Sequence, residues 1–138
     1  MAAAIAAAAP AASAYAEVTA DQAAITTIVD VTGLSATITV AAGRRVRITG
    51  HVTVKTSLVD HGGVLTIYEG AALLNSAWAV LAEASRRASL EVMAVVTSAA
   101  GAHTYKLCAA QYVSGTLLLH ASAAAPAFIL VEDIGPAA

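Results

Sequence analysis

The chain has 138 residues, a formal net charge of −2 and 12% charged residues, whereas an ordinary soluble domain has about 25%. Its length fits one domain, and its charge removes the attraction on which nucleic-acid and anionic-membrane binding normally rely. Alanine accounts for 37 residues, so the mean hydropathy of +0.76 reflects small side chains more than a large core. A surface with few charges and many small side chains favours association with other chains.

The chain begins with a continuous Ala-rich stretch over residues 1–16. No Lys or Arg precedes it, as a signal peptide would require, and it lacks the roughly 20 strongly apolar residues of a membrane span. We therefore expect an N-terminal arm over residues 1–22, which would need a surface to pack against in order to be ordered. The single cysteine, Cys108, excludes an internal disulfide and fits synthesis in a reducing cytoplasm.

After the arm, short segments of alternating apolar and polar residues are separated by glycine-containing turns, which is typical of a β-sandwich or barrel. The alternation is clearest over residues 34–40 and 45–55, while residues 71–84 have no decisive period and are assigned as a strand by context. The sequence predicts an all-β fold, an antiparallel jelly-roll-like sandwich in a single domain over residues 23–138. The expected strands number eight or nine and cover residues 23–30, 34–40, 45–55, 63–69, 71–84, 87–97, 103–112, 115–122 and 126–133.

The most enzyme-like string is Asp60-His61-Gly62-Gly63, because HGG-type loops supply oxyanion-hole amides in esterases. The Gly-x-Ser-x-Gly nucleophile elbow that such enzymes need is missing, so a plain hairpin loop is favoured over an active site. Glu132 and Asp133 are neighbours on a predicted strand and point to opposite faces, which favours salt bridges over paired acid–base catalysis. We predict a protein that is not an enzyme, with no catalytic residue and no cofactor.

The four histidines are far apart in sequence and show no metal-ligand spacing, although they could still converge in space. We expect each of His51, His61, His103 and His120 to be an exposed or hydrogen-bonded polar residue, and we predict no metal site. Cys108 lies on a predicted strand with no base placed beside it by the sequence, so a small buried apolar role is favoured.

One basic stretch places Arg45, Arg47 and Lys55 on the same predicted strand face. No aromatic residue is interleaved for base stacking, so an exposed or subunit-interface stripe is favoured over contact with a polyanion.

Three strings together resemble a family of small virion structural proteins from tailed bacteriophages of actinobacteria. The first string consists of residues 30–35 (DVTGLS) followed by residues 43–51 (GRRVRITGH), and the other two are residues 101–107 (GAHTYKL) and residues 125–136 (APAFILVEDIGP). The similarity spans about residues 25–136. The resemblance implies a jelly-roll protein on the capsid exterior, plausibly a homotrimeric decoration protein or head-fibre base. Its partners would be copies of itself and the major capsid protein, with no nucleic acid and no membrane.

On this hypothesis the arm lies on a neighbouring subunit or on the capsid, where small side chains permit close approach. The candidate interface residues are Ala3, Ile5, Ala8, Tyr15, Arg45, Arg47 and Lys55. The alternative is a tail- or fibre-associated jelly-roll module that recognises a host surface glycan through its loops. Low aromatic content and the lack of an acidic calcium cluster count against that alternative.

Overall fold

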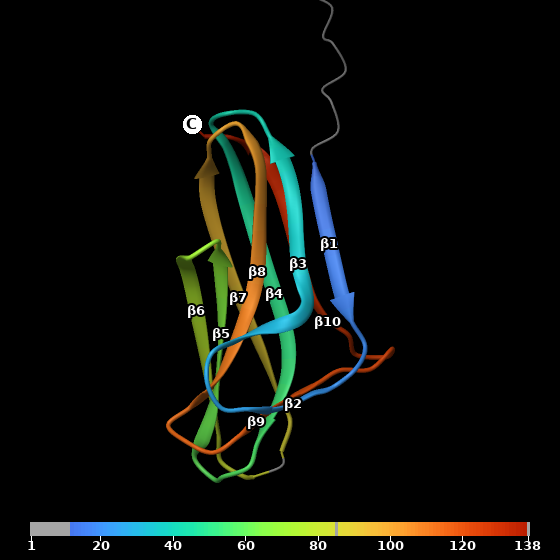
Figure 1. Ribbon diagram of the computed structural model, residues 1–138, viewed down its shortest axis with the longest axis vertical. Coiled ribbons are helices and arrows are strands. Elements are labelled where there is room, and N and C mark those ends of the chain that lie inside the picture. Colours follow the sequence, from blue (N-terminus) through green and yellow to red (C-terminus); the bar gives the residue numbers. More distant parts are fainter. Residues whose placement is uncertain (1–11, 85, 138) are drawn as a thin grey trace, which may run out of the picture.

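The computed structural model describes residues 12–84 and 86–137, and within these ranges the regular structure is entirely β-strand (Figure 1). No helix long and apolar enough to cross a membrane occurs in the described ranges. The strands are β1 (Ser13–Val18), β2 (Gln22–Ile25), β3 (Val29–Val40), β4 (Arg44–Thr56), β5 (His61–Glu69), β6 (Ala72–Leu81), β7 (Ala88–Ser98), β8 (Gly101–Tyr112), β9 (Leu117–His120) and β10 (Ala127–Pro136).

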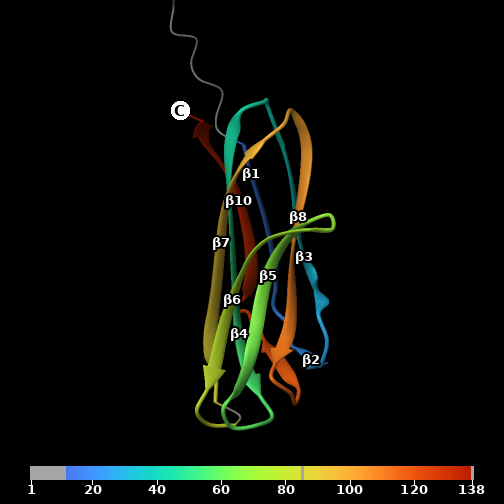
Figure 2. The same ribbon diagram turned by 90° about the vertical axis from the view of Figure 1, so that its left-hand side faces the viewer.

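The strands form two antiparallel sheets that pack face to face (Figure 2). In the six-stranded sheet, β4 pairs on one edge with β7 and on the other with β10 and β9, which pair in turn with β1 and β2. The four-stranded sheet has the order β3-β8-β5-β6. This is a jelly-roll β-sandwich, so the predicted fold class is confirmed, with ten strands instead of eight or nine.

The central strand β4 shows why this sequence forms a sandwich. Val46, Ile48, Val52 and Val54 alternate with polar residues and are 0% exposed, because every second side chain of a strand points into the core. Gly50 occupies the inward position between Ile48 and Val52, and a Cβ atom there would lie 2.5 Å from a methyl carbon of Leu107 in the opposite sheet. The missing side chain therefore leaves room for a large leucine between the two sheets.

The sandwich begins earlier than predicted, because β1 lies inside the region assigned to the arm. β1 pairs with β10 over its whole length, with Tyr15 opposite Leu130. Its residues alternate between exposed and half-buried, but small alanines on the inward side disguised this pattern as part of the Ala-rich stretch. The boundary predicted after residue 22 is therefore wrong for residues 13–22, while Ala3, Ile5 and Ala8 lie outside the described residues.

The predicted strand over residues 23–30 and the turn after it also differ from the structure. β2 ends at Ile25, and β3 begins at Val29 and runs on through Gly33. The register between β3 and β8 shifts between Asp30, opposite Cys108, and Ser35, opposite Lys106. Gly33 has a φ of +84° within this irregular stretch, so the glycine that predicted a chain reversal marks a bulge instead.

Strand β5 decides the structure of two further segments, residues 71–84 and the string at residues 60–63. The strand assignment of residues 71–84 is confirmed in part, because β6 pairs with β5 along Ala72–Leu81. The glycine pair of the Asp60-His61-Gly62-Gly63 string does not form the predicted loop. The chain turns before His61, and both glycines are buried within β5.

Candidate interaction surface

The outer face of the six-stranded sheet, which points away from the core, has an uncharged centre. Tyr15, Leu130, Thr49 and Met93 lie opposite one another across β1, β10, β4 and β7. We call these four residues the neutral row. Tyr15 and Met93 at its two ends are each 53% exposed, and Val95 beside Met93 is 48% exposed. Exposed apolar side chains gathered on one face are typical of an interaction surface.

Polar side chains next to the neutral row have partners within the chain, and among them Glu17 accepts a hydrogen bond from Tyr15 Oη over 3.0 Å. On one side Arg47 Nη2 lies 3.1 Å from Glu132 Oε1, and on the other His51 Nδ1 lies 3.2 Å from Glu91 Oε1. The ring of Phe128 stacks on His51 with centroids 5.4 Å apart. A partner that covers this face therefore meets an Arg47–Glu132 ion pair that is already formed, which lowers the desolvation cost of an interface at that point.

Glu132 and Asp133 form the salt bridges that the sequence predicted. Arg44 Nε lies 2.9 Å from Asp133 Oδ2, while Glu132 pairs with Arg47. The hydrogen bond from Arg44, together with one from the Gly135 amide, holds the pKa of Asp133 below its usual value.

The predicted basic stripe lies on this outer face, but its members are not equivalent. Arg45 is exposed, Arg47 is paired with Glu132, and Lys55 lies half-buried toward the other end of β4. Tyr15, also predicted, lies in the neutral row. Sequence reasoning missed Leu130, Met93 and Val95, because β7 and β10 carry apolar residues on both faces and alternation there does not show which face is buried.

A second apolar surface lies on the outer face of the four-stranded sheet. Trp78 and Val80 on β6 are 60% and 56% exposed. Val64 lies opposite both Trp78 and Ala110 on the neighbouring strands. The molecule therefore has two separate apolar surfaces, one on each sheet.

The four histidines do not converge. His51 contacts Glu91, His103 contacts Glu69, His120 lies 3.1 Å from Asp21, and His61 lies 2.7 Å from the Val59 carbonyl oxygen. Within residues 12–84 and 86–137, no group of three or more His, Cys, Asp or Glu side chains is placed to hold a metal ion.

Cys108 is buried as predicted, with one contact that the sequence did not indicate. Its Sγ atom donates a hydrogen bond to Asp30 Oδ1 over 3.3 Å, across the bulge of β3. Burial, and secondarily this hydrogen bond, raises the pKa of the thiol to about 11. The thiol is therefore neutral near pH 7 and is a poor nucleophile.

The pairing of His103 predicts a pH dependence of stability. Its Nδ1 lies 2.6 Å from Glu69 Oε2 and its Nε2 lies 2.8 Å from the Ala99 carbonyl oxygen, so two acceptors favour the doubly protonated ring. The pKa of His103 is raised, mainly by the Glu69 contact. This stabilisation is complete below the unfolded pKa of about 6.5 and is lost as pH rises through the folded pKa.

We expect the melting temperature of the native chain to exceed that of His103→Gln by more at about pH 5.5 than at about pH 8.5. Calorimetry of both proteins at the two pH values measures this difference, and His61→Gln is the control histidine variant. A difference that stays constant or widens at the higher pH would contradict the assignment.

Comparison with known proteins identifies the fold and no family. No family model and no curated protein matches the chain. Among solved structures, the Eiger TNF of S. frugiperda matches with a TM-score of 0.63 and 11% identity, over 94% of this chain and 96% of that chain. Murine APRIL, solved at pH 8.0 and pH 5.0, matches with TM-scores of 0.56 and 0.57 and 8% identity, over 90% of this chain and 99% of those chains. At this identity the likeness shows the jelly-roll fold alone.

Proposed function

We propose that this chain is a non-enzymatic bacteriophage virion protein that decorates the capsid exterior by binding the lattice of the major capsid protein. The observation that carries the proposal is the outer face of the six-stranded sheet, where the neutral row gathers exposed apolar side chains beside the Arg47–Glu132 ion pair. A decoration protein is held on its shell by buried area and by the symmetry of its assembly, and such a face suits the contact between subunits that this assembly needs. The resemblance of residues 25–136 to actinobacteriophage virion proteins supports the location.

We further propose that the protein is a homotrimer. Its two apolar surfaces, around Met93 on one sheet and Trp78 on the other, consist of different side chains. When two different surfaces of one chain meet, the contact is heterologous and closes into a ring if the rotation permits. Three copies form the smallest such ring, which agrees with the oligomer that the sequence resemblance implies.

The Ala-rich segment provides a test of capsid attachment. Deleting residues 2–11 leaves β1 intact, because β1 begins at Ser13. If the segment contacts the capsid, we expect the truncated protein to bind shells at least about tenfold more weakly, through loss of its contact area. Co-sedimentation with capsids measures binding, and an unchanged melting temperature serves as the control for folding. Undiminished binding would remove the arm from the proposed interface.

Antibody labelling of intact virions tests the proposed location. We expect gold-labelled antibodies against this chain to decorate the head uniformly and to leave the tail unlabelled. Labelling confined to the tail would overturn the decoration proposal and favour the tail- or fibre-associated alternative.

A further inference from the structure

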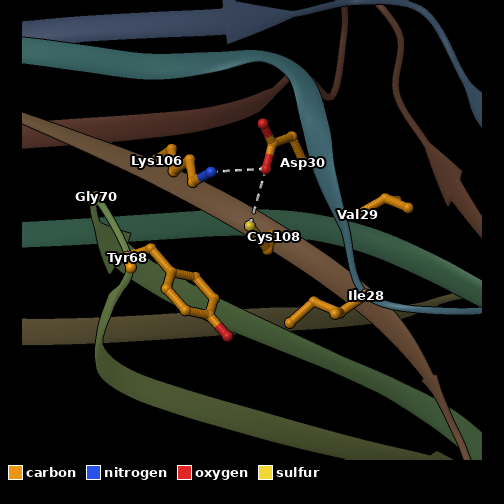
Figure 3. Close-up of a pocket in the computed structure, with 8 residues that line it drawn as sticks. Ile28, Val29, Asp30, Tyr68, Gly70, Lys106 and Cys108 are labelled. Carbon is orange, nitrogen blue, oxygen red and sulfur yellow. Dashed lines mark hydrogen bonds and ion pairs between the residues drawn. The ribbon is translucent and has the colours of Figure 1, made fainter.

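The bulge in β3 opens a cleft on the outer face of the four-stranded sheet. Where β3 leaves its regular register with β8, between Asp30 and Ser35, side chains of β8 are left partly uncovered. The resulting cleft has a volume of about 500 Å³, within the range of small-molecule sites. It is lined by Ile28, Val29, Asp30, Tyr68, Gly70, Ala71, Lys106 and Cys108 (Figure 3).

An ion pair lies in the cleft wall. Lys106 Nζ lies 3.0 Å from Asp30 Oδ1, which also accepts the hydrogen bond from Cys108. Both contacts use Oδ1, and Oδ2 accepts no hydrogen bond from the described residues. The Asp30 side chain is 67% exposed and that of Lys106 is 37% exposed, so an acceptor and a donor face the cleft side by side with no net charge.

Apolar groups complete the cleft. Figure 3 shows Tyr68 and Ile28 on the side away from the Asp30–Lys106 pair. Ile28 is 51% exposed and Val29 is 37% exposed. Gly70 and Ala71 contribute little bulk, and a Cβ at Gly70 would meet nothing within 4 Å. A second hollow, also lined by Asp30, Gly70 and Lys106, lies along the bulge toward Ser35 and Thr104, so the ion pair stands between two hollows.

We propose that this cleft binds a neutral pyranose unit of a saccharide. Neighbouring sugar hydroxyls donate to Asp30 Oδ2 and accept from Lys106 Nζ, while the C–H face of the ring packs on Tyr68. An uncharged ligand is favoured because an ion of either sign would compete with one member of the pair for the other. The cleft lies on the same sheet as Trp78, which belongs to one of the two surfaces assigned to self-association, but neither Trp78 nor Val80 lines it.

The test uses the full-length chain with two kinds of probe. The first is a set of free methyl pyranosides of glucose, mannose, galactose and rhamnose, each at about 20 mM, observed by amide chemical shifts. The second is an array of immobilised glycans. We expect at least one free sugar to bind with a dissociation constant on the order of 1 mM, because a small ligand in an open cleft makes few contacts. Shifted amides should fall within residues 28–35, 68–71 and 106–108.

Variants locate the site. Tyr68→Ala and Lys106→Met should each weaken binding roughly tenfold or more, since each removes one part of the recognition surface. Tyr112→Ala is the matched control, because Tyr112 is an exposed tyrosine at the end of β8 and does not line the cleft. If Tyr68→Ala fails to fold, Lys106→Met carries the test on its own.

Each outcome decides the proposal. Free-sugar binding without an array signal supports it with a small sugar as ligand, and binding in both arms supports it with a surface glycan as ligand. Absence of any shift and any array signal would overturn it, and so would binding that both cleft variants retain. Because capsid attachment is assigned to other surfaces, Tyr68→Ala should still bind shells, so failure here is distinguishable from failure of the decoration proposal.

Discussion

Replacing Tyr15 and Met93 together with lysine should convert the proposed homotrimer into folded monomers. Both side chains are half exposed in the isolated chain, so the substitutions should change the stability of one subunit by only about 1 kcal/mol. In an interface over the neutral row, each copy would bury two added ammonium groups, one near Glu17 and one near Glu91. Removing such charges from water costs at least about 3 kcal/mol, which corresponds to association roughly a hundredfold weaker or more. Sedimentation velocity over a range of concentrations measures the change.

The matched control adds the same charge elsewhere. Thr26→Lys with Thr39→Lys also introduces two lysines at exposed positions, but neither position lies on the outer face of the six-stranded sheet. This control should remain a trimer. If Tyr15→Lys with Met93→Lys also remains a trimer, the neutral row is not the self-association surface and the proposed assembly is wrong.

Replacing Gly62 with alanine should destabilise the sandwich by about 3 kcal/mol or more. A Cβ at this position would lie 1.6 Å from the carbonyl oxygen of Ala79 and 2.6 Å from its carbonyl carbon. Both atoms belong to the backbone of β6, so the clash cannot be relieved by turning a side chain. The strand pair β5–β6 would have to separate locally, which lowers the expected melting temperature by roughly 10 °C. Thermal unfolding followed by circular dichroism measures the loss.

The neighbouring glycine supplies the comparison. A Cβ at Gly63 would lie 2.8 Å from a methyl carbon of Leu117, and a leucine side chain can move by a few tenths of an ångström. We therefore expect Gly63→Ala to cost less than Gly62→Ala, about 1 to 2 kcal/mol, because Leu117 is fully buried but flexible. Equal losses for the two variants would show that β6 does not constrain β5 in the way that this structure describes.

Most of the fold could be predicted from period-two alternation. In β4 the pattern of valines and isoleucine against polar residues fixes both the strand and its buried face, and the structure confirms each position. The same signal failed for β1, because inward-facing alanines differ little from their neighbours in hydrophobicity. The prediction also failed around Gly33, where a glycine indicated a turn between two strands. A glycine with positive φ occurs in β-bulges as well as in turns, and here it lies in a bulge.

The candidate surfaces were less predictable, because they depend on contacts between distant segments. The neutral row joins residues from four strands, and no local pattern links Tyr15 with Met93. The cleft depends on a bulge that brings Asp30 to Lys106 and Cys108, which lie far away along the chain. The salt bridges of Glu132 and Asp133 were predictable as a class, whereas their partners Arg47 and Arg44 required the register of β10 with β4.

Binding to empty shells tests the decoration proposal most directly. Purified chain is titrated into phage capsids that lack it, and the bound copy number is measured by co-sedimentation. We predict saturable binding that ends at a fixed copy number, a multiple of three on each shell. A chain that remains folded and trimeric yet does not sediment with the shells at any concentration would contradict the proposal.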